Sequence, residues 1–180
     1  LAVAMDSKSR SFRKDMFDGY KATRPQAPAD LSQQIARLRD VIDAYAVPVF
    51  HEEGFEADDL IAGVVRRARE AALDVVIVSA DKDMLQLVGP GVVMYDTMRA
   101  KVFGVPETFE KMGVAPDKVV DLLALMGDSS DNVPGVKSVG PKTAAQLVNE
   151  YGGLDGVYAS LDQIKRKALR EQLEKSKDDA

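Results

Sequence analysis

Short apolar runs that alternate with helical patterns constrain the fold of this chain more than any other feature. Residues 75–78 are continuously apolar, which is typical of a strand covered on both faces by helices. Residues 30–46, opened by an Asp30–Gln33 capping box, and residues 60–72 repeat apolar side chains at helical spacing. The alternation predicts an α/β fold with a mostly parallel central sheet flanked by helices. We expect strands at residues 1–5, 47–50, 75–78, 92–95 and 101–103.

The last third of the chain carries helical patterns only. Because no strand pattern follows residue 103, we expect two parts, an α/β core over residues 1–115 and a helical lobe over residues 116–180. Helices are expected at residues 106–112, 116–126, 143–151 and 161–175.

Composition excludes several classes of protein. The 180 residues contain no Cys, which rules out disulfides and thiolate metal sites, and no apolar run is long enough to span a membrane. We therefore expect a cytoplasmic protein. Because the chain opens within a strand pattern at Leu1, we also expect a fragment of a longer protein.

The net charge of −5 hides an uneven distribution. Six basic residues lie in residues 8–24 and six more in residues 165–177, so the acidic excess falls in the middle. An acidic centre with basic flanks is typical of a metal-dependent nuclease, although solvated helix faces give the same pattern. The first basic group comprises Lys8, Arg10, Arg13, Lys14, Lys21 and Arg24.

Carboxylates follow the predicted strands. In parallel sheets, sites form where the strands end, and a loop after a predicted helix adds two further carboxylates. Such a cluster repels itself unless cations are present, and hard oxygen ligands without nearby Cys or His favour two Mg²⁺ or Mn²⁺ ions. Alternatively, Asp58 and Asp59 only complement a helix dipole, and the loop carboxylates only stabilise a turn. The candidate metal ligands are Asp6, Glu56, Asp58, Asp59, Asp81, Asp83, Asp128 and Asp131.

Two segments are suited to binding phosphates. Residues 135–140 form a turn bounded by glycines, and Pro141 follows where a helix begins. Free N–H groups at that helix start, with Lys137 and Lys142 beside them, predict a phosphate site. In the other segment, Tyr20 is either a core aromatic or a base-stacking residue, with Lys21 and Arg24 holding phosphates.

These motifs together resemble the 5′-nuclease domains of bacterial DNA polymerase I, which belong to the flap endonuclease family. The resemblance covers nearly the whole chain in the same order, and the last two motifs are highly specific. The motifs are Asp6 after a strand, Phe12-Arg13, Tyr20-Lys21, Arg24-Pro25, Glu56-Ala57-Asp58-Asp59, Asp81-Lys82-Asp83-Met84, residues 126–132 and residues 135–144.

The resemblance implies a PIN-like core and a 5′→3′ exonuclease and flap endonuclease that acts in primer removal and repair. It implies two divalent ions that activate water. Glu56, Asp58, Asp81 and Asp83 would form the inner cluster, Asp6 and Asp59 would lie beside it, and Asp128 and Asp131 would serve the second ion. It also implies that the family's first strand, with one site carboxylate, is missing from this sequence.

The resemblance further implies how DNA is held. Tyr20, Lys21 and Arg24 would lie at the base of a helical arch that admits the 5′ single strand. A helix–three-turn–helix would hold duplex DNA, often through K⁺, using Gly135, Lys137, Gly140, Lys142 and Thr143. The implied partners are DNA with a 5′ flap or a nick and a covalently linked polymerase domain, and the implied state is a monomer.

Two other functions remain open on the sequence. The first is a truncated module that binds branched DNA without cutting it, and binding in EDTA without cleavage in Mg²⁺ would support it. The second is a Mg²⁺-dependent phosphohydrolase for small esters, which has little use for the phosphate site after Gly135. Steeply salt-dependent DNA binding would count against the second.

Overall fold

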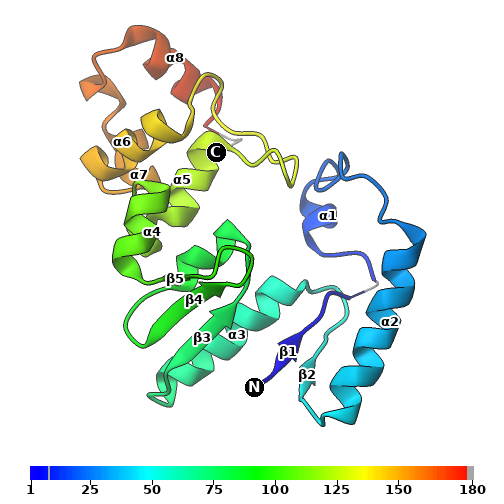
Figure 1. Cartoon of the computed structure of the whole chain (residues 1–180). Helices are drawn as coiled ribbons and strands as arrows, with labels where there is room; N and C mark the ends of the chain where they lie inside the picture. The colour runs from blue at the N-terminus through cyan, green and yellow to red at the C-terminus, as the bar shows by residue number, and fades with distance from the viewer. Residues whose placement is uncertain (8, 178–180) are drawn as a thin grey trace.

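The computed structural model describes residues 1–7 and 9–177, and it has the α/β architecture expected from the sequence (Figure 1). None of the helices in these residues is long and apolar enough to cross a membrane. In the first part of the chain the elements are β1 (Val3–Ala4), α1 (Arg13–Met16), α2 (Ala29–Ala44), β2 (Val49–Phe50), α3 (Ala57–Glu70), β3 (Val75–Val78), the 3-10 helix η1 (Lys82–Leu87), β4 (Val92–Asp96) and β5 (Lys101–Phe103).

The strands form two small sheets where the sequence predicted one central sheet. β1 pairs with β2 in parallel, with Val3 opposite Val49. β3 pairs with β4 in parallel, and β4 pairs with β5 in an antiparallel hairpin. Within the described residues no ladder joins β1 to β3, and α3 contacts one strand of each sheet. Figure 1 shows α3 running between the two sheets.

Two local predictions in this region are wrong. β3 is not covered on both faces, because Val76 and Val78 are 60% and 61% exposed while Ile77 is buried. The capping box at Asp30 does not form either. α2 begins at Ala29 with Pro28 in the capping position, so Asp30 lies inside the first turn.

α2 runs along one side of the molecule with most of its apolar residues exposed (Figure 1). Only Ile42 of this helix is buried among the side chains that the structure describes. Apolar residues at helical spacing normally mark the face that packs against a core. Here that face is open, and its exposed members are Leu31, Ile35, Leu38, Val41 and Tyr45.

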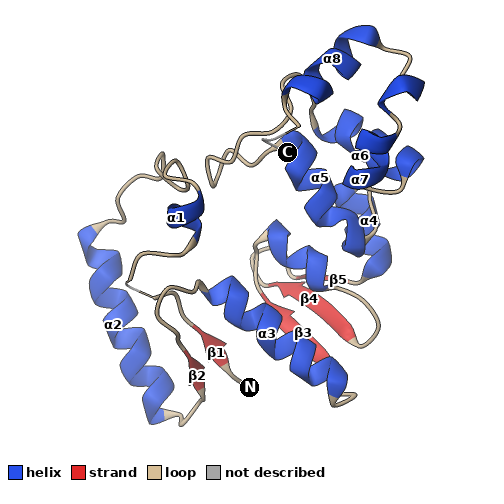
Figure 2. Cartoon of the chain, turned by 180° about the vertical axis from the view of Figure 1, so that it is seen from behind, coloured by secondary structure: helices blue, strands red, loops and turns tan. Residues whose placement is uncertain are grey.

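The second part of the chain is a helical lobe stacked on the β3–β4–β5 sheet (Figure 2). The predicted helix over residues 116–126 is split, because Pro116 opens a 3-10 turn before the α-helix. The helix after the Gly152–Gly153 pair was not predicted, since it is short and contains Gly156. The elements are α4 (Val105–Met112), η2 (Pro116–Lys118), α5 (Val119–Met126), α6 (Pro141–Tyr151), α7 (Leu154–Ala159), η3 (Leu161–Gln163) and α8 (Lys167–Lys175).

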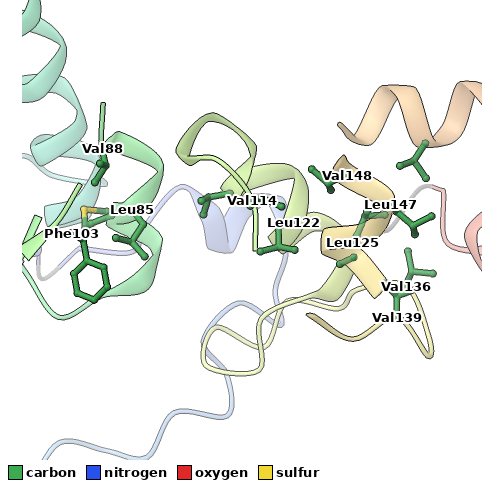
Figure 3. Packing of buried hydrophobic residues seen from close by; sticks show 14 of the residues in the cluster. Leu85, Val88, Phe103, Val114, Leu122, Leu125, Val136, Val139, Leu147 and Val148 are labelled. Atoms are coloured by element: carbon green, nitrogen blue, oxygen red, sulfur yellow. The ribbon is translucent and has the colours of Figure 1, made fainter. Parts of the chain in front are cut away.

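One continuous hydrophobic core joins the β3–β4–β5 sheet to the helical lobe. Figure 3 shows Leu85 and Phe103 on the sheet side and Leu122, Leu125 and Val148 among the lobe helices. All five residues are at most 2% exposed, and each fully buried leucine stabilises the fold by roughly 1.5–3 kcal/mol. The core therefore fixes the position of the lobe, and of the loop that leaves α5, relative to the sheet.

Candidate active site

The loop after α5 brings the carboxylates of the helical lobe to the N-terminal part of the chain. This loop, residues 127–133, is closed by two backbone hydrogen bonds of 2.8 and 2.9 Å between Asp128 and Val133. It is then anchored to the segment around Gly19 and Lys21. The backbone N–H of Lys21 donates to the carbonyl oxygen of Asp131 at 2.8 Å, and Asn132 Nδ2 donates to the carbonyl oxygen of Gly19 at 2.7 Å.

Two glycines allow this loop to turn back on itself. Gly127 has a φ of 73°, and a Cβ added there would lie 2.5 Å from the backbone nitrogen of Gly135. A Cβ on Gly135 would overlap the backbone of Gly127 and Met126 in the same way. Any side chain at either position would force the strands of the turn apart. The close contact therefore sets where Asp128 lies.

Glu56, just before α3, is held by two donors from the N-terminal segment. Tyr20 Oη donates to Glu56 Oε2 at 2.8 Å and Lys21 Nζ donates to it at 2.7 Å. The Tyr20 ring is only 7% exposed, and burial followed by the hydrogen bond to Glu56 raises the pKa of its hydroxyl. A ring this little exposed favours the alternative of a core aromatic over a base-stacking residue. Tyr20 instead positions Glu56.

Asp59, predicted from the sequence as a metal ligand beside the inner cluster, is paired with Arg13 in this structure. Arg13 donates to both of its carboxylate oxygens, at 2.8 and 2.7 Å, and the backbone N–H of Glu56 donates to Asp59 Oδ2 at 2.9 Å. The hydrogen bond from Arg13 holds the pKa of Asp59 below its usual range, against the opposing effect of burial. Asp59 therefore stabilises the start of α3.

Asp6 and Asp58 lie near the same helix start. Asp6 is exposed, and its Oδ1 accepts the N–H of Ala57 at 2.7 Å. Burial raises the pKa of Asp58, and the negative charges of Asp81 and Asp6 raise it further. Carboxylates from the ends of β1 and β3 therefore act electrostatically on Asp58 at the start of α3.

Asp81 and Asp83 lie at the start of η1, directly after β3. Asp81 Oδ1 accepts the N–H of Asp83 at 2.9 Å and so caps η1. Burial raises the pKa of Asp83 to about 6, and the charges of Asp81, Asp128 and Asp131 add to the effect. The Oδ1 atom of Asp83 is buried and has no hydrogen-bond partner among the described residues. An uncompensated buried oxygen among like charges is suited to a cation.

Asp128 and Asp131 are each paired with a basic side chain. Lys82 Nζ lies 2.7 Å from Asp128 Oδ2, and Arg24 Nη2 lies 2.5 Å from Asp131 Oδ1. Burial acts to raise the pKa of Asp128, but the hydrogen bonds from Lys82 and from the N–H of Ser130 outweigh it and lower the pKa. Arg24 Nε also donates to the carbonyl oxygen of Ser130 at 3.2 Å, which fixes the loop from outside.

Three basic residues of this site were missed from the sequence. Lys82, Arg99 and Lys111 line a pocket of about 400 Å³ together with four of the carboxylates. Lys82 lies between Asp81 and Asp83 in the sequence, so that its presence in the site could have been predicted from that position. Arg99 and Lys111 come from the β4–β5 turn and from α4, and only the fold brings them here. The full lining is Arg24, Ala80, Asp81, Lys82, Asp83, Arg99, Lys111, Asp128, Ser130 and Asp131.

A second, more basic pocket of about 540 Å³ adjoins Glu56. Lys21 and Arg24 lie on its wall, as expected of residues that hold phosphates, and three serine hydroxyls were not anticipated. Lys8, part of the predicted basic run, lies outside the described residues. The lining is Asp6, Ser7, Ser9, Arg10, Ser11, Lys14, Lys21, Arg24, Phe55 and Glu56.

The carboxylates have the chemistry to bind a hard cation, but they are not arranged as a complete set of metal ligands in this structure. Within residues 1–7 and 9–177, no three acidic or histidine side chains stand close enough to hold a metal ion. Lys21, Arg24 and Lys82 occupy oxygens of Glu56, Asp131 and Asp128 instead. Asp83 nevertheless keeps a buried oxygen without a partner among the described residues, and burial raises the pKa values of Asp58 and Asp83, so a cation near them would be stabilising. The donor set fits Mg²⁺ or Mn²⁺.

The predicted phosphate site lies at the start of α6. Gly140 precedes the helix and Pro141 is in its first turn. Lys137, Gly140 and Lys142 are exposed, whereas the intervening Val136 and Val139 are 2% and 5% exposed and anchor the turn to the core. The helix therefore presents its first N–H groups and two lysines to solvent, while Gly135 packs against Gly127. Thr143 is partly buried in the first turn.

Comparison with known proteins gives consistent results along the whole chain. Residues 1–113 match the family described as "5'-3' exonuclease, N-terminal resolvase-like domain", and residues 114–180 match "5'-3' exonuclease, C-terminal SAM fold". DNA polymerase I of Rhizobium leguminosarum is 49% identical over 173 residues, which cover 96% of this chain and 17% of that protein. The 5'-3' exonuclease of Aquifex aeolicus is 36% identical over 179 residues, which cover 98% of this chain and 62% of that protein.

A solved structure with the same fold is the T5 D15 protein co-crystallised with metal ions. It has a TM-score of 0.84 and 24% identity, over 97% of this chain and 70% of that chain. This chain thus spans about a fifth of the length of the DNA polymerase I relatives and under two thirds of the Aquifex protein. The agreement of both family matches with the fold leads to one conclusion: the chain belongs to the 5′-3′ exonuclease family.

Proposed function

We propose that this chain is a divalent-metal-dependent 5′ nuclease, acting as a 5′→3′ exonuclease and flap endonuclease on DNA with a 5′ flap or a nick. One observation carries the proposal. The 127–133 loop is hydrogen-bonded to the segment around Lys21, so that Asp128 and Asp131 join Asp83 in a pocket that Arg24 also lines. Family membership and the DNA-processing relatives support it.

Acidic residues that line this pocket, with Asp58 beside them, would hold two Mg²⁺ or Mn²⁺ ions. Asp58, Asp81 and Asp83 are suited to one position and Asp128 and Asp131 to the other. Bound ions would supply the charge that lowers the pKa of an attacking water and stabilises the leaving oxygen. Metal-bound relatives support a divalent cofactor, since the T5 5′-exonuclease has been solved with zinc ions.

The chain's own residues position the substrate. Lys21 and Arg24 line the basic pocket beside Glu56, where they would hold phosphates on either side of the bond to be cut. In hydrolysis the water oxygen forms a bond to phosphorus, one ester P–O bond breaks, and the leaving oxygen takes up a proton. Tyr20 keeps Glu56 oriented toward the site through its 2.8 Å hydrogen bond.

Duplex DNA would bind at the start of α6. The exposed N–H groups there, with Lys137 and Lys142, are suited to a phosphate of the duplex, and Gly140 leaves room for close backbone approach. Carbonyl oxygens of the same turn are candidates for K⁺. We further infer a division into a nuclease core over residues 1–115 and a DNA-binding lobe over residues 116–180, and a cytoplasmic monomer. We also infer a linked polymerase domain, which the relatives named DNA polymerase I support.

The test is cleavage of a 5′-labelled flap duplex by this 180-residue chain, first with Mg²⁺ and then with EDTA. Metal-dependent cutting near the junction is expected. DNA binding without cutting under both conditions would replace the proposal with a binding module. A chain that neither binds nor cuts DNA would overturn the proposed function. Hydrolysis of a small phosphate ester in place of DNA would point to a phosphohydrolase.

A further inference from the structure

The pocket around Asp128 is electrically balanced by its own side chains. Four carboxylates line it, and so do four basic residues. A divalent ion entering such a pocket adds positive charge where positive charge is already present. A basic side chain that is paired with one of these carboxylates would then compete with the ion. The basic residues are Arg24, Lys82, Arg99 and Lys111.

Lys82 is the basic residue best placed to leave. Arg99 is paired with Asp96, which is not part of this pocket's lining, and Lys111 lies over the Phe103 ring at 4.6 Å. Arg24 binds the Ser130 carbonyl as well as Asp131 and so helps hold the loop. Among the residues that the structure describes, the ammonium of Lys82 pairs with Asp128 alone, and the Lys82 side chain is 34% exposed.

Asp128 is where the competition would occur. Its Oδ1 accepts the N–H of Ser130 at 2.7 Å, and its Oδ2 lies 2.7 Å from Lys82 Nζ, so both oxygens are engaged. Its side chain is 10% exposed. Leaving such a carboxylate without a counter-charge would be unfavourable, given that Asp83 nearby already lacks a partner. A divalent ion at Oδ2 would compete with the ammonium for the same oxygen and would repel its charge.

We propose that Lys82 is an internal counter-ion for Asp128 that exchanges with the divalent ion, an inference that rests on the proposed metal-dependent function. Without metal, the ammonium occupies the carboxylate and stabilises the 127–133 loop. When metal binds, the flexible four-carbon stem moves the ammonium toward solvent. Lys82 thereby lowers the metal affinity of the Asp128 side of the pocket and keeps the pocket folded while it is empty.

Mn²⁺ binding, followed by electron paramagnetic resonance of the free ion, tests the exchange directly. Lys82→Gln should bind Mn²⁺ about fivefold to tenfold more tightly, the range expected for loss of a partly exposed competing charge. Its thermal midpoint in EDTA should fall, and saturating Mn²⁺ should close the gap to the wild type. Lys82→Arg keeps the charge and should stay close to wild type. Lys167→Gln removes the same charge from the exposed Lys167–Glu171 pair and should change neither quantity.

A second measurement uses the unmodified protein, so it does not depend on a variant that folds. Amine acetylation followed by mass spectrometry should label Lys82 faster once Mn²⁺ is added, while labelling of Lys167 stays constant. Unchanged or weaker Mn²⁺ affinity in Lys82→Gln, or unchanged labelling of Lys82, would overturn the exchange. A wild-type chain that binds no Mn²⁺ at all would instead overturn the proposed function, so the two failures are distinguishable.

Discussion

At the scale of single residues, the carboxylates near the strand ends have different tasks. Asp59 is held by Arg13, Asp128 by Lys82 and Asp131 by Arg24, whereas Asp83 has a buried oxygen without a partner. Sequence reasoning could place these aspartates in one region, because strand ends and motif spacing are local signals. It could not separate Asp59 from the others, since Arg13 lies 46 positions away in the chain.

The different tasks of Asp59 and Asp81 can be tested with one pair of variants. Asp59→Asn should lower the free energy of unfolding by about 1–3 kcal/mol, because a charge-assisted pair with Arg13 is lost. It should leave the number of bound Mn²⁺ ions unchanged. Asp81→Asn should instead abolish cleavage and weaken Mn²⁺ binding by more than the ~10- to 100-fold typical of an outer-sphere partner.

Thermal unfolding and Mn²⁺ titration of both variants give the comparison. Asp128→Asn should behave like Asp81→Asn, with duplex binding largely retained. Full flap cleavage by Asp81→Asn or Asp128→Asn would contradict the two-ion proposal, and loss of Mn²⁺ binding in Asp59→Asn would return that residue to the metal site.

Asp96, which is paired with Arg99 at the edge of the metal pocket, provides a pH-dependent prediction. It is fully buried, and the hydrogen bond from Arg99, together with the N–H groups of Arg99 and Met98, holds its pKa below the usual 3.8. A lowered pKa stabilises the fold at pH values above 3.8 and loses this contribution as the pH falls through the lowered value. Asp96→Asn should therefore be less stable than wild type at pH 7, and the difference should shrink below pH 4.

Urea unfolding at a series of pH values measures this difference. Asp40→Asn, at an exposed position on α2, is the matched control and should show almost no difference at any pH. A gap between Asp96→Asn and wild type that stays constant down to pH 2 would show that the Asp96 charge does not contribute.

At the scale of elements, the 127–133 loop connects the helical lobe to the segment around Gly19 and Lys21, and the start of α6 follows it. The close Gly127–Gly135 contact shapes the loop, and the buried Val136 and Val139 fix the turn before α6. The sequence predicted both elements, because glycine, proline and aspartate mark turns and helix starts. It did not predict that the loop binds the segment around Gly19, which is a contact over more than a hundred residues.

Gly135→Ala should distort the loop. Its Cβ would overlap the backbone of Gly127 and Met126, so the free energy of unfolding should fall by about 1–3 kcal/mol, as for other overpacked sites. The displaced Asp128 should also weaken Mn²⁺ binding. Gly63→Ala is the control, since a Cβ there meets nothing within 4 Å and the helix should gain about 0.5–1 kcal/mol. Equal stability of both variants would contradict the tight turn.

Lys142 in the first turn of α6 should contribute one phosphate contact. Lys142→Ala should weaken duplex binding at low salt and reduce the slope of log affinity against log salt by about one unit. The control is Lys101→Ala, which removes the same charge from β5, where Lys101 pairs with Glu110 of α4. It should leave the slope unchanged. Fluorescence anisotropy of a labelled duplex at several salt concentrations gives both slopes, and an unchanged slope for Lys142→Ala would remove the phosphate role.

At the scale of the whole molecule, the sequence predicted the order of elements better than their assembly. The strand and helix positions follow from local periodicity, and most of them were correct within a few residues. The division into two sheets was not predicted, because strand pairing depends on contacts that no local pattern encodes. For the same reason, Val76 and Val78 were expected to be covered, and the exposure of the apolar face of α2 was not anticipated.

The exposed side of α2 has a practical consequence for anyone who handles this protein in solution. Five large apolar side chains along α2 and at its C-cap are from 41% to 78% exposed and form a continuous apolar stripe. Such a surface favours aggregation at high concentration. Leu38→Glu, at the middle of the stripe, should lower static light scattering of a concentrated, heated sample and reduce the fluorescence of a bound hydrophobic dye. Gln34→Glu adds the same charge at an exposed polar position of the same helix, outside the apolar stripe. It should change both signals far less.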